Sequence, residues 1–240
     1  MPDAPAPTIG LRLYIIGDIH GRADLLDQMV AKIDDDIARH RRTNCVTITL
    51  GDYIDRGPNS RGVLERLSRN PFPTRYIALK GNHEALLEMF LRNPSVADQW
   101  RRLGGLETLH SYGVPINEVM VGKGYDKAAQ ALRAAIPNDQ LRFLSTLQLF
   151  VSIGEYFICH AGIRPGVPLA KQTEDDLLWI RNEFLESEAM FEKIIIHGHT
   201  PLEWPDVRRN RINIDTGAFA TGRLTCLVAD PENSRFLYTD

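Results

Sequence analysis

Five short polar segments in this 240-residue chain carry residues suited to chemistry, and each one follows an apolar run. They combine small residues, mainly glycine, with Asp, Asn or His side chains. Five of the seven histidines lie in them, and His40 and His110 do not. Ligands of open α/β sheets bind outside the carboxyl ends of the strands, so we expect the segments to meet at one sheet edge. The segments are Gly17–Gly21, Gly51–Gly57, Gly81–Glu84, His160–Gly162 and His197–Thr200.

The residue types in these segments favour a metal centre. Asp, Asn and His without Cys form a nitrogen and oxygen ligand set, which suits Mn²⁺, Fe or Zn²⁺ in an open catalytic site. Two ions about 3.5–4 Å apart serve in-line attack on phosphorus, and the guanidinium of Arg56 suits phosphate oxygens. Six candidate ligands would hold two ions if one carboxylate bridged them. They are Asp18, His20, Asp52, Asn82, His160 and His199.

The elements that must position these segments alternate between strands and helices. This alternation predicts parallel pairing and an α/β core. Apolar runs predict strands over 12–18, 45–52, 75–82, 155–162 and 193–200. Helical spacing of apolar residues predicts helices over 25–38, 60–69, 84–91 and 175–187.

Three further regions complete the predicted organisation. Residues 1–10 are rich in proline and are expected to form a flexible arm, which leaves a single domain over 11–240. Helical patterns broken by glycine and proline fill about 95–149, and we interpret this region as a helical insertion because core strands flank it. The three apolar runs at the carboxyl-terminal end, 211–215, 223–230 and 235–239, predict an antiparallel meander.

The composition excludes several classes of protein. Apolar residues make up 43% and charged residues 25%, and the net formal charge of −3 provides no basic field for nucleic acid. No run approaches 18 apolar residues, and the first ten residues lack the features of a secretory signal. The three cysteines lie in apolar runs and predict no disulfide framework. We therefore expect a cytoplasmic protein with neither a nucleic-acid nor a membrane partner.

The motifs GDIHG, GDYIDRG and GNHE, followed by a later His and by GHT, resemble those of a known family. This is the phosphoprotein phosphatase branch of the calcineurin-like metallophosphoesterases, and the resemblance to bacterial serine/threonine protein phosphatases covers roughly Arg12 to Asp230. Pro201 separates the chain from the GHxH branch of the superfamily. The resemblance implies a sandwich of mixed β-sheets flanked by helices. It also implies two divalent ions, Mn²⁺ above all, with Fe or Zn²⁺ as alternatives.

The resemblance implies a role for each motif residue. Asp18 and His20 would hold the first ion, and Asp52 would bridge both. Asn82, His160 and His199 would hold the second. His83 would be the general acid, oriented by Asp55, and Arg56 would bind phosphate. Arg181 is the first choice for a second phosphate-binding arginine, and Arg164 is the next.

Several alternatives stay open at this stage. The leading function is hydrolysis of phosphoserine and phosphothreonine proteins by a hydroxide that bridges the two ions. Symmetrical hydrolysis of diadenosine tetraphosphate is the alternative, and a non-catalytic metal-bound scaffold is a remote one. His197 is a weaker ligand candidate than His199, and Glu84 is either a support for the ligands or an ordinary helix charge. Arg101 and Arg102 are the adjacent pair that could cradle a polyphosphate.

Overall fold

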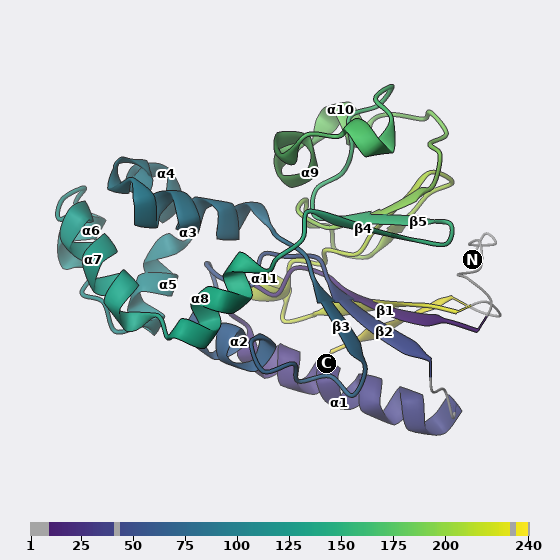
Figure 1. Cartoon of the computed structure of the whole chain (residues 1–240), viewed down its shortest axis with the longest axis horizontal. Helices are drawn as coiled ribbons and strands as arrows, with labels where there is room; N and C mark the ends of the chain where they lie inside the picture. Colours follow the sequence, from purple (N-terminus) through teal and green to yellow (C-terminus); the bar gives the residue numbers. More distant parts are fainter. Residues whose placement is uncertain (1–9, 41–43, 231–233, 240) are drawn as a thin grey trace.

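Two five-stranded β-sheets form the centre of the protein (Figure 1). The structure is a computed structural model that describes residues 10–40, 44–230 and 234–239. Almost all of the expected arm therefore lies outside the described residues. A sandwich of two mixed sheets flanked by helices confirms the predicted fold class.

The first sheet has the strand order β10-β9-β1-β2-β3. Its parallel half consists of β1 (Arg12–Ile16), β2 (Cys45–Thr49) and β3 (Arg75–Ala78), while β9 (Thr225–Ala229) and β10 (Arg235–Tyr238) are antiparallel. Every residue of β1 and β2 is buried, as expected for parallel strands covered on both faces.

The second sheet has the order β4-β5-β6-β8-β7. Its strands are β4 (Phe150–Ile153), β5 (Tyr156–Cys159), β6 (Ile194–His197), β7 (Asp206–Val207) and β8 (Arg211–Asn213). β8 pairs in parallel with β6, so the predicted carboxyl-terminal meander is wrong. Only β9 and β10 form the expected antiparallel pair, because the chain crosses from one sheet to the other after β8 through α11 (Ala218–Thr221).

Apolar side chains fill three layers. Leu13 and Ile15 of β1 point between the sheets and pack with residues such as Ile196 and Ile212. Tyr14 and Ile16 point to the opposite face, where α1 (Ala23–His40) and α2 (Ser60–Leu67) cover the first sheet. This alternation follows from the two-residue period of a strand. The outer face of the second sheet packs under α9 (Glu174–Trp179) and α10 (Asn182–Leu185).

The segment predicted as one helix over 175–187 is broken in the structure. Ile180 ends α9 with extended backbone (φ −60°, ψ 143°), and Arg181 precedes α10 with φ −132° and ψ −107°. The interruption separates Arg181 from both helices. A short 3₁₀ helix, η2 (Leu169–Lys171), precedes α9.

A group of helices follows α3 (Asn82–Arg92) and lies to the left of the sheets in Figure 1. Four of them match the helical patterns in the sequence, whereas η1 and α6 are short turns that the sequence does not mark. The group packs on the same apolar cluster as α1 and α2. None of the helices in the described part of the chain is long and apolar enough to cross a membrane. The group comprises η1 (Pro94–Val96), α4 (Ala97–Arg102), α5 (Gly105–Ser111), α6 (Asn117–Met120), α7 (Tyr125–Ala135) and α8 (Asn138–Ser145).

Candidate metal and phosphate site

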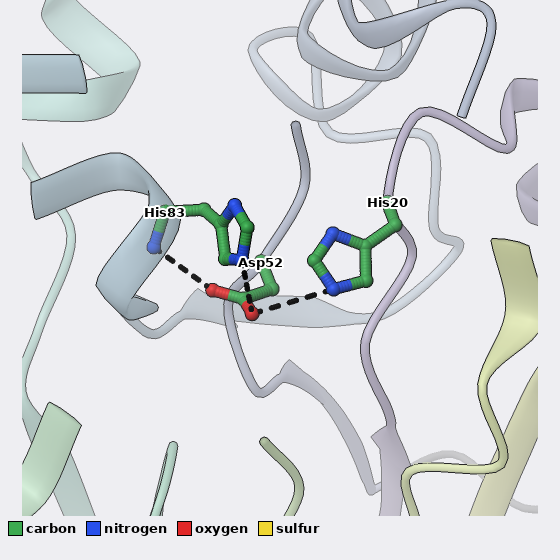
Figure 2. Close-up of side chains that lie close together, drawn as sticks. All are labelled: His20, Asp52 and His83. Atoms are coloured by element: carbon green, nitrogen blue, oxygen red, sulfur yellow. Dashed lines mark hydrogen bonds and ion pairs between the residues drawn. The ribbon is translucent and has the colours of Figure 1, made fainter. Parts of the chain in front are cut away.

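The polar segments from both sheets converge on Asp52. Its carboxylate belongs to two groups of buried side chains whose ligand atoms lie within 4.8 Å of one another. One group is His20, Asp52 and His83 (Figure 2), and the other is Asp52, His160 and His199. The expectation of a single sheet edge was too simple, because His20 and Asp52 follow strands of the first sheet whereas His160 and His199 follow strands of the second.

The backbone of these segments is unusual. Among the described residues, six residues other than glycine have a positive φ between 44° and 71°, and five of them are motif residues. Such left-handed conformations are unfavourable for residues with a Cβ atom, and they persist where the surrounding structure imposes them. The five are His20, Asp52, Asp55, Arg56 and His199.

Glu84 imposes much of this conformation. Its carboxylate is fully buried and accepts hydrogen bonds from the N–H groups of Asp52 (2.8 Å), Tyr53 (2.8 Å) and Gly81 (3.0 Å). A Cβ atom on Gly81 would lie 2.1 Å from Oδ1 of Asp52, so only glycine fits there. Glu84 is thus more than a helix charge, because it ties the segments after β2 and β3 together.

Two histidines are oriented by backbone carbonyls. His20 Nδ1 lies 2.9 Å from the oxygen of Ile54, and His160 Nδ1 lies 3.1 Å from the oxygen of Leu50. A carbonyl oxygen can only accept, so Nδ1 carries the proton and Nε2 carries a lone pair. Burial lowers the pKa of His20 to about 3 and also lowers the pKa of His160, which keeps both rings neutral, as metal ligands must be.

These lone pairs face oxygen atoms that are also rich in electrons. His20 Nε2 is 3.5 Å from Asp52 Oδ2, and His160 Nε2 is 3.4 Å from Asp52 Oδ1. Asn82 Oδ1 is 2.9 Å from both His160 Nε2 and His199 Nδ1. Donor atoms converging in this way suit a cation between them.

Buried polar atoms without hydrogen-bond partners give a second test of whether these residues suit a cation. Asp18 Oδ1 and His199 Nε2 have no hydrogen-bond partner among the described residues. Asp18 lies outside both groups of ligand atoms, but its Oδ2 accepts the backbone N–H of His199 at 3.0 Å. Burial and the nearby Asp215 and Asp52 charges raise the pKa of Asp18 well above its usual value. A divalent cation would relieve this crowding of carboxylates, so the residues present fit a metal centre.

His83 and Asp55 form a buried pair beside Asp52. His83 Nδ1 donates to Asp55 Oδ2 at 2.6 Å, which leaves Nε2 to face the site 3.7 Å from Asp52 Oδ2. Burial opposes a charge on this ring, but the Asp52 carboxylate and the bond to Asp55 raise the pKa of His83 to about 9. Because a raised pKa favours the protonated form below it, His83 can carry a proton at neutral pH.

Two arginines lie at the site and a third is committed elsewhere. Arg56 Nη2 is 3.5 Å from His83 Nε2, and Arg181 Nη1 donates to Thr200 Oγ1 at 3.2 Å. Burial is the main cause that lowers the pKa of His160 and of His199, and the Arg181 charge adds to it. Arg164 instead bonds the carboxylates of Asp176 and Glu183. The choice of Arg181 over Arg164 as a phosphate ligand stays a prediction.

Some site residues are missing from the sequence-based predictions. Asp215 follows β8 in the pattern Ile-Asp-Thr-Gly, which resembles the other strand ends but was assigned to the meander. The ring of Phe219 lies 4.8 Å under the Arg56 guanidinium and 5.4 Å from the His20 ring. The ring of Trp179 lies 6.4 Å from that of His199.

The comparisons with known proteins agree with this geometry. A family model described as calcineurin-like phosphoesterase matches residues 11–224. The chain belongs to this family. It is a phosphoesterase with relatives in the bacterial phosphatases, and the family uses divalent metals, although the ligand roles given above stay predictions.

Relatives of this phosphoesterase carry two kinds of name. Serine/threonine-protein phosphatase 2 of Salmonella typhimurium is 28% identical over 89% of this chain and 90% of its own length. The asymmetrical bis(5′-nucleosyl)-tetraphosphatase PrpE of Anoxybacillus flavithermus is 26% identical over 89% and 88%. A cold-active protein tyrosine phosphatase shares the fold, with a TM-score of 0.60 and 17% identity over 97% of this chain and 81% of that one.

Replacing the two histidines around Gly198 separates a ligand from a core residue. His197 packs its ring 4.9 Å from Phe184, and neither group of ligand atoms includes it. We expect His199→Ala to lower the metal content of the purified phosphoesterase and His197→Ala to leave it unchanged. Elemental analysis of both variants measures this directly. Loss of metal from the His197 variant alone would reverse the assignment.

Proposed function

We propose that this phosphoesterase hydrolyses phosphomonoesters, with phosphoserine and phosphothreonine residues of proteins as its substrates. The observation that carries the proposal is the pair of arginines, Arg56 and Arg181, beside a metal-binding arrangement and the buried His83–Asp55 pair. A terminal phosphoryl group presents oxygen atoms to both guanidinium groups, which bind such oxygens in a fork geometry.

The proposal assigns the ligands as the resemblance implies. Asp18 and His20 would hold one ion, Asn82, His160 and His199 would hold the other, and Asp52 would serve both. Mn²⁺ is the proposed metal because the donor set contains only nitrogen and oxygen, and Fe or Zn²⁺ suits the same set. When bound, the two ions neutralise phosphate charge and activate water.

The chain's own residues bind the substrate and move a proton. Arg56 and Arg181 orient the phosphoryl group and stabilise the charge that develops on its oxygens. His83 Nε2 donates a proton to the departing oxygen, since its Nδ1 is engaged with Asp55. Asp55 fixes the orientation of the ring and balances its positive charge.

The contacts of Arg101 and Arg102 bear on whether this adjacent pair could bind a polyphosphate. The guanidinium of Arg101 is committed to Asp98 at 2.7 Å and to the carbonyl oxygen of Met120 at 3.2 Å. Arg102 is the exposed member of the pair, and its charge also acts on Asp98. A single surface cation is a weak anchor for the remaining phosphates of a dinucleoside polyphosphate, and this favours a monoester substrate.

A second candidate function rests on the PrpE relative, whose name specifies asymmetrical hydrolysis of a bis(5′-nucleosyl) tetraphosphate. The sequence pattern suggested the symmetrical type. Asymmetrical and symmetrical hydrolysis both require an internal phosphorus of the substrate at the metals. They also require a binding site for the remaining phosphates, which a monoester does not have.

A substrate panel with added Mn²⁺ tests the proposal. We expect phosphoserine and phosphothreonine peptides and aryl phosphates to be hydrolysed well, and diadenosine tetraphosphate poorly. The measurement is kcat/KM for each substrate, with product analysis by chromatography. A value for diadenosine tetraphosphate about 100-fold above the best phosphopeptide, roughly 2.7 kcal/mol of transition-state preference, would reverse the ranking. Loss of that preference in an Arg101→Ala, Arg102→Ala double variant would then locate the cradle.

A further inference from the structure

Asp55 joins the candidate site to the helices that follow α3. Its Oδ2 accepts from His83 Nδ1 at 2.6 Å and from Trp100 Nε1 at 2.8 Å. Its Oδ1 accepts from Thr108 Oγ1 at 2.5 Å. The carboxylate is fully buried, so each of these bonds replaces water that the site excludes. Two of the three donors come from α4 and α5, not from the motif segments.

Thr108 is the centre of a small hydroxyl network. Its Oγ1 donates to Asp55 Oδ1, so its lone pairs must accept. They face the Asp55 N–H at 3.0 Å and the Ser60 hydroxyl at 2.9 Å. The one proton and two lone pairs of the threonine hydroxyl are thus all used. Thr108 therefore holds the carboxylate of Asp55. Together with Ser60, whose Oγ also accepts the Asp55 N–H at 3.0 Å, it holds the strained backbone there (φ 71°).

The same helices approach the next motif residue and α3. The Arg56 N–H donates to the carbonyl oxygen of Gly104 at 3.2 Å. A Cβ atom on Gly104, whose φ is 102°, would lie 2.5 Å from the Arg56 nitrogen, so this contact requires glycine. The ring of Trp100 packs 4.6 Å from that of Phe90 on α3, the helix that carries His83. The helices that follow α3 thus contact both the Asp55 segment and the helix that carries His83.

We propose that Trp100 and Thr108 are positioning residues for proton donation, which gives the helical insertion a role in catalysis. By bonding different oxygens of Asp55, they fix the plane of the carboxylate. A fixed Asp55 in turn holds the proton on His83 Nδ1 and directs Nε2 at the departing oxygen. The inference rests on the proposed function of His83 as general acid.

Three variants and one matched control test the inference. Trp100→Phe removes the N–H donor and keeps an aromatic ring against Phe90. Thr108→Val removes the hydroxyl at similar volume, and Thr108→Ser restores it. The control is Tyr112→Phe, which deletes another buried hydroxyl bond of the insertion, to Gln140, without touching Asp55.

We expect Trp100→Phe and Thr108→Val to lower kcat on a phosphoserine peptide by about 10–100-fold, by analogy with residues that orient metal ligands through a hydrogen bond. The loss should be smaller on p-nitrophenyl phosphate, whose leaving group needs little protonation. KM and metal content should stay unchanged, and Thr108→Ser should regain most of the activity. Equal losses on both substrates, or losses no larger than in Tyr112→Phe, would overturn the inference. If Thr108→Val does not fold, Trp100→Phe decides.

A spectroscopic readout separates this inference from the proposed function. The imidazole proton of His83 that bonds Asp55 should give a low-field NMR resonance that His83→Ala removes. Trp100→Phe and Thr108→Val should shift this resonance, and Tyr112→Phe should not. An unmoved resonance would refute the positioning role whatever the activities are. If His83→Ala loses activity equally on both substrates, the general-acid proposal fails. A resonance that shifts in Trp100→Phe and Thr108→Val would still support the positioning of Asp55 by these two residues.

Discussion

Asp52→Asn is expected to nearly abolish hydrolysis and to lower the occupancy of both metal ions. Asp52 is the one residue shared by the two groups of ligand atoms, and its carboxylate lies 3.4 to 3.7 Å from the Nε2 atoms of His160, His20 and His83. Exchanging one carboxylate oxygen for an amide removes the negative charge that both ions would share. A loss of several kcal/mol of charge stabilisation corresponds to about 10³-fold or more in kcat.

Two measurements on the Asp52→Asn variant are decisive together. Elemental analysis should find fewer than two ions per chain, and turnover of p-nitrophenyl phosphate should fall in parallel. Asp176→Asn is the matched control, because Asp176 is also a buried aspartate but pairs with Arg164 away from the site. We expect the control to keep its metal. Two tightly bound ions and full activity in Asp52→Asn would contradict the bridging role.

His83→Ala is expected to discriminate between leaving groups. A serine alkoxide departs poorly without a proton, whereas p-nitrophenolate departs with little help. General acid catalysis is worth about 10²–10⁴-fold, so we expect a loss of that size on a phosphoserine peptide and a much smaller one on p-nitrophenyl phosphate. The ratio of the two kcat values is the quantity to measure.

His197→Ala provides the control for this ratio. His197 is as buried as His83, but its ring packs on Phe184 and is absent from both groups of ligand atoms. Any general loss of stability should lower both activities alike and leave the ratio unchanged. The same losses on both substrates in His83→Ala would show that His83 supports the metal site or Asp55 and does not donate the proton.

The strained backbone of the motif residues explains why the site depends on hydrogen bonds from residues outside it. His20, Asp52, Asp55 and Arg56 all have positive φ, and a loop free of tertiary contacts would relax from such conformations. Glu84 holds the segment that begins at Asp52, and Thr108 and Gly104 hold its continuation through Asp55 and Arg56. Chemistry at Asp52 and His83 thus depends on residues that contribute no ligand atom.

Local patterns in the sequence were sufficient to predict the parallel strands and most of the candidate ligands. Continuous apolar runs such as residues 13–16 mark parallel strands, because a strand covered on both faces has no polar side to alternate with. Polar and glycine-rich segments at the ends of those strands marked the candidate ligands, since the carboxyl ends of parallel strands collect functional groups. The strands and the candidate ligands at their ends depend on residues that are neighbours along the chain. They can therefore be predicted before the fold is known.

Only the tertiary structure decided which distant groups meet. It placed β8 beside β6, which added the segment containing Asp215 to the strand ends, and it broke the predicted helix at Ile180. Arg181 bonds Thr200 beside His199, whereas Arg164 pairs with Asp176 and Glu183. The tertiary structure also brought Trp100 and Thr108 to Asp55 across more than 40 residues. The physical reason is that strand partners, ion pairs and buried hydrogen bonds are chosen by competition among groups far apart in the chain, and local sequence spacing does not record the outcome of that competition.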